Sequence, residues 1–183
     1  MTAAQFSVAY TEPRNRLTTF FRTILVIPHA IVMNAWQYLA QVLGFIQWWI
    51  ILFTGKRNQS IWNLQNAWLG YAARVNAYWS LMYDKWPNIG VEPNGEPTSY
   101  SFEYEAKANR LSNFFRIIWA IPALIIGLIV LIGAAIVVIL CWFAIIITGK
   151  QPRGMFDFLN KVHQFMTRVN AYLLLMTDTY PKF

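Results

Sequence analysis

The sequence predicts an all-α integral membrane protein built from two tandem, pseudo-symmetric repeats. Two long stretches, 23–53 and 117–147, contain no Asp, Glu, Lys or Arg. Apolar stretches longer than about 18 residues are typical of segments embedded in a bilayer. The chain is 57% hydrophobic and only 13% charged, against roughly 45–50% and about 25% in a soluble domain. Short motifs also recur at a constant spacing, which indicates an internal duplication.

The duplication has an offset of 94 residues and no gap, so that Asn15 corresponds to Asn109. The motifs of the first half that return in the second are Asn15-Arg16-Leu17, Phe20-Phe21-Arg22, Ile27-Pro28, Thr54-Gly55-Lys56 and Arg74-Val75-Asn76-Ala77-Tyr78. Such self-similarity indicates one structural unit present twice. We assign residues 1–93 to the first repeat and 98–183 to the second. The Pro-, Gly- and Asn-rich segment 87–97 reads as the linker.

Each apolar block is too long for one ordinary crossing. A straight helix of 31 residues is about 46 Å long, against a hydrocarbon core of roughly 30 Å. The blocks also have candidate breaks near their midpoints, at 34–37 and between Gly127 and Gly133. We therefore predict a hydrophobic helical hairpin in each repeat, which would place all flanking Arg and Lys on one side of the membrane. The alternative is one kinked spanning helix per repeat, preceded by a separate entry helix that ends at Pro28 or Pro122.

An amphipathic helix is predicted after each block, at 59–84 and 153–178. Polar residues recur at intervals of three and four, and the remaining surface of the first of these helices is rich in Trp and Tyr. Aromatic side chains with a polar tip favour the headgroup level, so we expect helices that lie in the membrane interface. The expected interface anchors are Trp62, Trp68, Trp79, Tyr78 and Tyr172. Packing of these helices on the protein's own membrane segments is the alternative.

Basic residues flank the apolar blocks and give the chain a net charge of +7. Because guanidinium groups bind phosphate bidentately, we expect the repeated arginines to hold anionic phospholipid headgroups. These are Arg16, Arg22, Arg74, Arg110, Arg116 and Arg168. The alternative is a structural role in which they pair with carbonyls or a carboxylate. No basic stripe or module typical of nucleic-acid binding is present, so nucleic acid is not an expected partner.

Residues typical of catalysis are sparse. The two histidines, His29 and His163, have no Cys, Asp or Glu at metal-ligand spacing. The single cysteine, Cys141, lies inside the second apolar block. We expect no catalytic residue, metal or cofactor.

A polar stripe runs along the first apolar block at helical spacing and consists of Asn34, Gln37 and Gln41. The corresponding residues of the second block are Leu128, Leu131 and Ala135, so the stripe was not retained in both copies. Polar residues inside a membrane segment often mark a solute pathway. The stripe motivates a transport hypothesis.

The order of a basic entry, an apolar block, Thr-Gly-Lys and an aromatic-rich amphipathic helix resembles a family of bacterial membrane proteins classed as a domain of unknown function. The resemblance covers roughly 14–87 and 108–181, and its most specific part is 52–58. It implies a location and an architecture but no activity. The second copy departs from the pattern with Gln151-Pro152 in place of Arg57-Asn58.

The leading function hypothesis is a non-enzymatic accessory or scaffold subunit of the bacterial cytoplasmic (inner) membrane, with a multi-pass topology. It would pack against partner membrane proteins or against its own copies, and would bind anionic lipid. A small oligomeric transporter or channel is one alternative, and a membrane-shaping protein is another.

Overall fold

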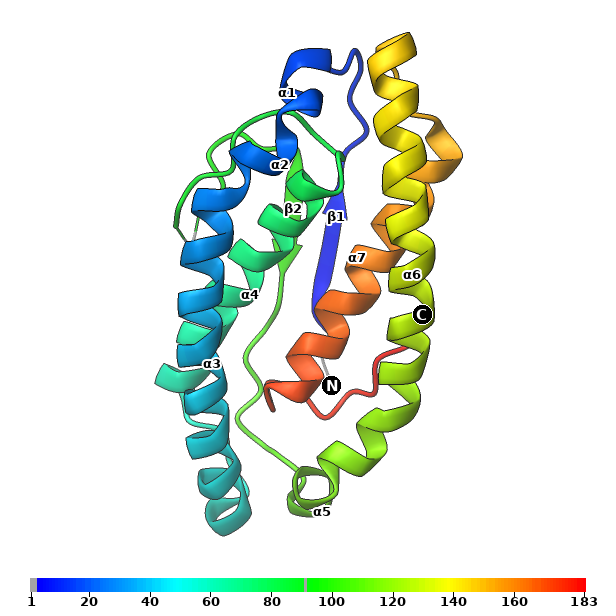
Figure 1. Cartoon of the computed structure of the whole chain (residues 1–183). Coiled ribbons are helices and arrows are strands. Elements are labelled where there is room, and N and C mark those ends of the chain that lie inside the picture. The colour runs from blue at the N-terminus through cyan, green and yellow to red at the C-terminus, as the bar shows by residue number, and fades with distance from the viewer. Residues whose placement is uncertain (1–2, 91) are drawn as a thin grey trace.

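The computed structural model describes residues 3–90 and 92–183, so Val91 of the linker and residues 1–2 of the first repeat lie outside it. Within these residues the chain is mostly helical and contains two short strands (Figure 1). The first repeat contributes β1 (Gln5–Val8), α1 (Arg16–Phe20), α2 (Arg22–Leu25), α3 (Ile27–Thr54) and α4 (Gln59–Trp79). The second part contributes β2 (Thr98–Ser101), α5 (Arg110–Phe114), α6 (Arg116–Thr148) and α7 (Arg153–Leu173).

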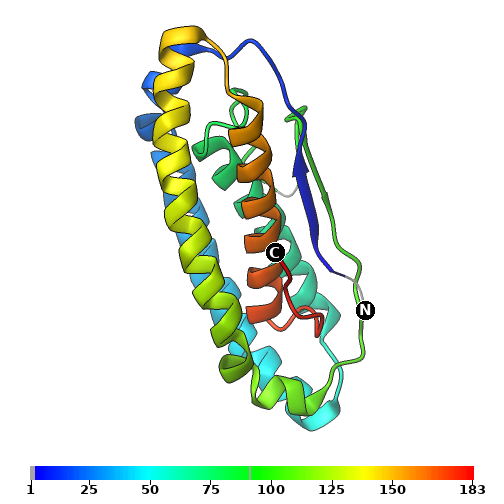
Figure 2. The ribbon, with the colours of Figure 1, turned by 90° about the vertical axis from the view of Figure 1, so that its right-hand side faces the viewer.

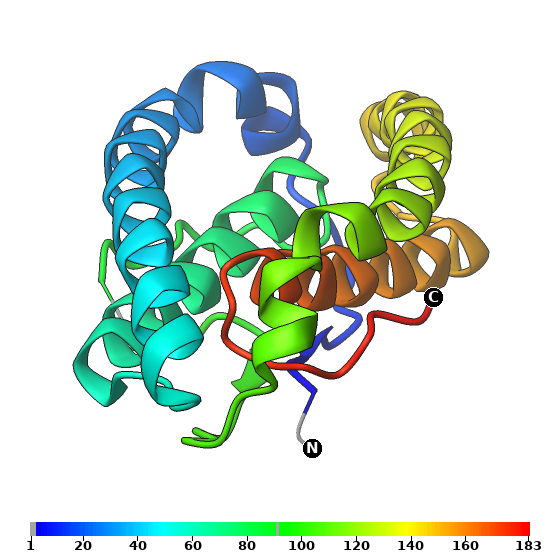
Figure 3. The same ribbon diagram turned by 90° about the horizontal axis from the view of Figure 1, so that it is seen from below.

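The elements form three layers. The long helices α3 and α6 stand apart on one side of the molecule and run in opposite directions (Figures 1 and 3). Behind them, α4 packs on α3, α7 packs on α6, and α4 and α7 contact each other. The third layer is the antiparallel pair β1–β2, in which Phe6 lies opposite Tyr100 and β1 lies against α7 (Figure 2).

The two repeats exchange their short entry helices. Helix α1 packs on α6 of the other repeat, and α5 packs on α3. Equivalent backbone bonds close both junctions, from Arg14 N to Gly149 O (3.0 Å) and from Ala108 N to Gly55 O (3.0 Å). Gly55 and Gly149 end α3 and α6 with φ of 69° and 74°, a left-handed conformation that favours glycine. The predicted Thr-Gly-Lys turns are therefore confirmed.

The predicted hairpins are wrong, because each apolar block forms one continuous helix: α3 has 28 residues and α6 has 33. The expected breaks do not interrupt either helix. Asn34 donates its side-chain amide to the carbonyl of Ala30 in the same helix (2.7 Å). Gly127 and Gly133 face side chains of α7, which a Cβ at either position would meet at ordinary van der Waals distance. The alternative of one helix per block is therefore correct as to continuity, and Pro28 lies in the first turn of α3. Pro122 lies inside α6, so the separate entry helix expected to end there is wrong. That the two helices span a membrane stays a prediction.

Both long helices are long and apolar enough to cross a membrane by length and composition. At about 1.5 Å per residue they measure about 42 and about 50 Å.

The prediction of an all-α fold misses the sheet. In β1, Phe6 and Val8 are buried and Gln5 and Ser7 are exposed, the alternation expected of a strand. Four residues are too few for this alternation to be recognised in the sequence. The partner strand lies in the segment that joins the repeats, and nothing local marks it. The amphipathic helices are confirmed but end earlier than predicted, at Trp79 and Leu173. Leu81 and Leu175, at φ of 62° and 64°, end both in the same way.

Candidate functional site

The most polar part of the interior is a junction that occurs twice. In the first copy, Arg22 Nη2 lies 2.7 Å from Asp84 Oδ1, and the guanidinium group lies 3.9 Å from the centre of the Tyr78 ring. The other Asp84 oxygen accepts the backbone N–H of Asn15 (2.8 Å). The Arg22 side chain is almost completely buried, so the pair joins the entry helix to the end of α4 inside the protein.

The second copy repeats this geometry closely. Arg116 Nη2 lies 2.7 Å from Asp178 Oδ1, its guanidinium group lies 4.3 Å from the Tyr172 ring centre, and Asp178 accepts the N–H of Asn109 (2.9 Å). Burial by itself raises the pKa of Asp178. The Asn109 hydrogen bond and the charges of Arg57 and Arg116 outweigh that effect and lower the pKa below its ordinary value.

The two junctions differ in where their additional arginine comes from. Arg57 Nη2 lies 2.8 Å from Asp178, and Arg57 Nε donates to Leu175 O (2.7 Å). In the other junction Gln151 occupies the position that corresponds to Arg57, and Arg14 donates to its side-chain oxygen (2.9 Å) and to Met82 O. The residue that corresponds to Arg14 in the second copy is Ala108. Each junction thus has one additional guanidinium group: Arg14, from the segment before α1, in the first, and Arg57, from the turn after α3, in the second.

Arg16 and Arg110 are exposed and lie at the ends of the long helices. Arg16 Nη2 donates to Ile147 O near the end of α6 (3.2 Å), and Arg110 Nη2 donates to Phe53 O near the end of α3 (3.0 Å). A cation at a helix C-terminus satisfies carbonyls that lack a partner within the helix. Each repeat therefore caps the long helix of the other.

The remaining two arginines bind the linker and strand β1. Arg74 is buried and donates to Gly90 O in the linker. Arg168 is partly buried, and it donates to Gln5 Oε1 (3.2 Å) and Lys182 O (3.3 Å). The headgroup prediction is wrong for Arg22, Arg74 and Arg116, because their guanidinium groups are buried within the protein. For Arg16, Arg110 and Arg168 it stays a prediction.

Four of the five expected interface anchors are also buried. Trp62 donates its indole N–H to Met176 O (3.2 Å), and Trp68 donates to Met33 O (3.3 Å). Tyr78 and Tyr172 lie under the arginines of the two junctions. The anchor prediction is wrong for these four residues, since the packing of α4 and α7 on the protein's own helices prevails. Trp79 is exposed.

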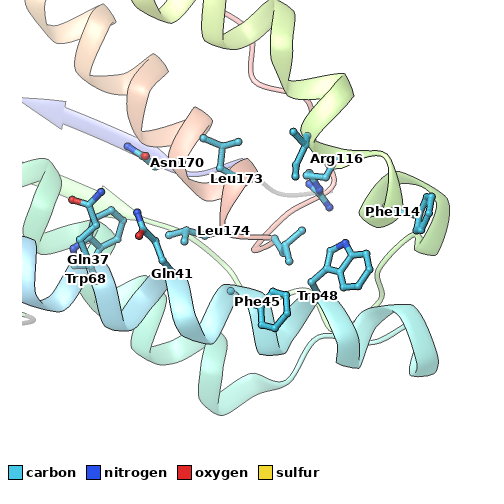
Figure 4. Close-up of a pocket in the computed structure, with 13 residues that line it drawn as sticks. Gln37, Gln41, Phe45, Trp48, Trp68, Phe114, Arg116, Asn170, Leu173 and Leu174 are labelled. Atoms are coloured by element: carbon cyan, nitrogen blue, oxygen red, sulfur yellow. The ribbon is translucent and has the colours of Figure 1, made fainter.

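Part of the polar stripe lines a cavity of about 470 Å³ between α3, α7 and the start of α6 (Figure 4). We name it the α3–α7 cavity. Gln37 and Gln41 extend from α3 into it, and Asn170 lies on α7 across the cavity (Figure 4). Asn34 lies outside it, on the wall of a second hollow formed with α2 and Trp79. The other lining residues are Gly44, Phe45, Trp48, Trp68, Phe114, Arg116, Ile117, Leu173, Leu174 and Leu175.

The histidines take part in packing. His29 Nδ1 is hydrogen-bonded to Tyr71 Oη (2.8 Å) between α3 and α4, and His163 Nε2 to Ser80 Oγ (2.9 Å) between α7 and the end of α4. Burial lowers the pKa of His163 to about 4. Across residues 3–90 and 92–183, no group of three or more His, Cys, Asp and Glu is arranged to hold a metal ion.

The sequence interpretation missed the role of Asp84 and Asp178. Both follow a repeated arginine at the same distance along the chain, Arg22 to Asp84 and Arg116 to Asp178. That shared spacing between opposite charges was the available signal for an ion pair inside each repeat.

Comparison with family models gives two matches, at residues 16–88 and 110–183, both to the family described as "Domain of unknown function (DUF4389)". The chain belongs to this family. Each matched DUF4389 segment begins at an entry helix and includes the Arg–Asp ion pair of its repeat, Arg22 with Asp84 or Arg116 with Asp178. Comparisons with curated proteins and with solved structures give no match.

Proposed function

We propose that this protein is a non-enzymatic accessory or scaffold protein of the membrane that lies in the plane of one leaflet. Helices α3 and α6 would sit among the acyl chains, and the strands would face water. The observation that carries this proposal is the segregation of exposed side chains between the first and third layers of the fold.

The exposed surface of the first layer is mostly apolar along both helices, and Asn34 and Gln41 of α3 are the exposed amides within it. Its exposed large hydrophobic residues include Ile31, Val42, Phe45, Ile46 and Phe53 on α3, and Ile118, Ile125, Ile129, Ile136, Leu140 and Phe143 on α6. Of the charged residues, only Arg116 falls within these two helices, and it is buried. An exposed apolar surface that extends over two helices of 28 and 33 residues exceeds what a soluble monomer normally leaves in water.

The third layer and the outer side of α7 are polar. Gln5 and Ser7 face outward from β1, Ser101 does so from β2, and Lys161 is exposed on α7. On this surface, Gln164 Nε2 donates a hydrogen bond to Gln5 Oε1 (2.8 Å).

The position of this polar layer favours a helix pair in the membrane plane over one that crosses it. Figure 2 shows β1 on the side of α7 away from α6, level with the middle part of both helices. If α6 stood upright in the bilayer, the outer edges of the two-stranded sheet would lie at hydrocarbon depth. Open sheet edges do not occur there, because lipid cannot satisfy backbone N–H and C=O groups. With α3 and α6 in the plane, the strands stay in water.

The positive charges support the same placement. Antiparallel α3 and α6 put Lys56 and Arg110 at one end of the molecule and Arg16 and Lys150 at the other. Two spanning helices would distribute these cations to both sides of the membrane, against the usual cytoplasmic excess. An in-plane molecule keeps all of them at one anionic surface, where each contributes about 1 kcal/mol.

Labelling at the two ends tests the proposal. Lys56→Cys and Lys150→Cys change equivalent exposed residues at opposite ends, and the native Cys141 is buried. With a membrane-impermeant maleimide applied to sealed vesicles, we expect both variants to be labelled from the same side. Labelling from opposite sides would establish a crossing. Recovery of the parent protein in the soluble fraction would overturn the membrane location itself.

Membrane shaping is a second candidate, and the in-plane placement favours it. Insertion of two long helices into one leaflet adds area to that leaflet only, which promotes curvature. Electron microscopy of liposomes with increasing protein content tests this candidate. We expect tubules or smaller vesicles, and unchanged spherical liposomes at saturating protein would contradict it.

A further inference from the structure

We propose that the α3–α7 cavity binds an uncharged membrane amphiphile, with an apolar chain and a head group that carries hydrogen-bond acceptors. The inference rests on the proposed in-plane placement, because the ligand would enter the cavity from the leaflet.

The shape of the cavity suits such a ligand. Its rim is formed by Phe45, Phe114 and Ile117, which are 65%, 56% and 78% exposed and belong to the apolar layer. Its inner wall is formed by buried residues, among them Trp68 and Leu174. A volume of about 470 Å³ lies within the roughly 300–1,000 Å³ of ligand sites. An acyl or prenyl chain at the rim would remain continuous with the lipid.

Three neutral amide side chains line the cavity. Gln37 and Gln41 on α3 and Asn170 on α7 each carry an NH₂ group that donates to carbonyl, ester or hydroxyl oxygens (Figure 4). Gln37 and Gln41 are not needed to form the long helix, since Leu131 and Ala135 occupy the corresponding positions of α6. Polar side chains on an otherwise apolar helix weaken its burial in lipid, and Gln37 and Gln41, unlike Asn34, line the cavity, so a ligand there accounts for them.

The charged residue of the cavity does not suit an anionic ligand. Arg116 lines the cavity, but Nη2 binds Asp178 (2.7 Å) and Nη1 donates to Tyr172 O (3.2 Å) and Thr177 O (2.6 Å). Three of the five guanidinium N–H groups are thus engaged within the protein, and the positive charge is already paired with Asp178, which leaves no uncompensated cation for a phosphate. The adjacent Asp178 carboxylate would also repel it. The head group is therefore an uncharged acceptor.

Two kinds of membrane compound carry this chemistry, a glycerol ester and a quinone, and separate probes distinguish them. One probe is a monoacylglycerol with a brominated chain, and the other is a decyl-substituted benzoquinone. Both quench tryptophan fluorescence, and Trp48 and Trp68 line the cavity. Titration of the purified protein in detergent gives a saturable dissociation constant for each probe.

The test variant is Gln37→Leu combined with Gln41→Ala, which installs the residues that α6 already carries at these positions. Loss of two hydrogen bonds is expected to weaken binding of the preferred probe about tenfold. Asn34→Leu is the matched control: it removes an amide from the same helix, outside the cavity, and should leave the dissociation constant unchanged.

A second variant fills the cavity and leaves the amides in place. Gly44→Val introduces the residue found at the corresponding Val138. A Cβ at Gly44 would lie 3.4 Å from Gln65 Nε2 and 3.7 Å from Leu174, which the fold can accept. We expect binding of both probes to weaken.

Equal affinity of the double variant and Asn34→Leu for both probes would overturn the proposal. So would stronger binding of brominated phosphatidylglycerol than of either neutral probe. Flotation with liposomes distinguishes a failure of the ligand-site proposal from a failure of the proposed membrane placement. The double variant should float like the parent, because its apolar layer is intact. A parent that fails to float refutes the membrane placement, whereas weak probe binding by a protein that floats refutes only the ligand site.

Discussion

The contact between α3 and α4 in the first copy and the contact between α6 and α7 in the second use the same backbone with different chemistry. The first contains the His29–Tyr71 hydrogen bond, and Gln65 donates to Ala40 O of α3 (3.2 Å). The second has apolar residues at the corresponding positions. His29, Gln47, Gln65 and Tyr71 are replaced by Ala123, Cys141, Leu159 and Phe165.

This difference separates what the scaffold requires from what it tolerates. The Arg–Asp junctions, the glycine caps and the left-handed leucines are shared, so they belong to the requirements of the fold. The amides of α3 occur once, and α6 packs on α7 without them. A buried polar group costs stability unless it is hydrogen-bonded, so an unshared polar group is a stronger candidate for function than a shared one.

The largest expected effect breaks the second junction. Asp178→Asn removes the negative charge between Arg57 and Arg116, whose side chains are 0% and 3% exposed. Two buried cations then lack a counter-charge, and we expect a loss of about 3–5 kcal/mol. Asp84→Asn, where a single ion pair involves a carboxylate 23% exposed, should cost less, about 1.5–3 kcal/mol. Thermal unfolding in detergent measures both, and equal losses would contradict the ranking.

The same junction makes the stability of the fold sensitive to acid. Because the pKa of Asp178 is lower in the folded protein than in the unfolded chain, its contribution is complete above the unfolded pKa of about 4. It is lost as the pH falls through the folded pKa. Asp178→Asn should remove this part of the acid sensitivity.

The next prediction tests whether the two junctions are interchangeable. Arg57→Gln gives the second junction the glutamine of the first, and we expect a loss of about 1.5–3 kcal/mol. Adding Ala108→Arg then supplies a guanidinium group from the position that corresponds to Arg14. The double variant should be more stable than Arg57→Gln alone. Ala108→Arg in the parent background is the control, and we expect it to be destabilising because Arg57 already occupies the site.

Much of this architecture could be predicted from the sequence, and the misses have a common cause. The repeat, the Thr-Gly-Lys turns and the amphipathic helices depend on local patterns, so periodicity reveals them. The direction in which Arg22 and Arg74 point depends on a partner far along the chain, Asp84 or Gly90. An apolar block beside them suggested lipid, because sequence alone does not give the depth of burial. The sheet was missed because β1 pairs with a strand at least 90 residues along the chain.

A smaller effect concerns the crossing of α4 and α7. His163 and Ser80 form a hydrogen bond there, and the corresponding residues Leu69 and Leu174 belong to one apolar cluster. The pKa of His163 is about 4 against 6.5 in the unfolded chain, so the unfolded chain takes up a proton first. Stability should therefore fall as the pH falls from about 6.5 to about 4. In the variant His163→Leu with Ser80→Leu, the melting temperature should depend less on pH between about 6.5 and about 4. If it depends on pH as strongly as in the parent, His163 is not the cause of the loss of stability.

The smallest expected effect decides what the exposed arginines do. Arg16→Gln and Arg110→Gln each remove a cation from a helix C-terminus, and we expect each to cost about 0.3–1 kcal/mol. Lys161→Gln, an exposed cation within α7, is the control and should cost less. If capping is their role, the loss is the same in detergent and in liposomes of any composition. If headgroup binding dominates, the loss appears only with anionic lipid, and native mass spectrometry of the variants then records fewer bound phosphatidylglycerol molecules.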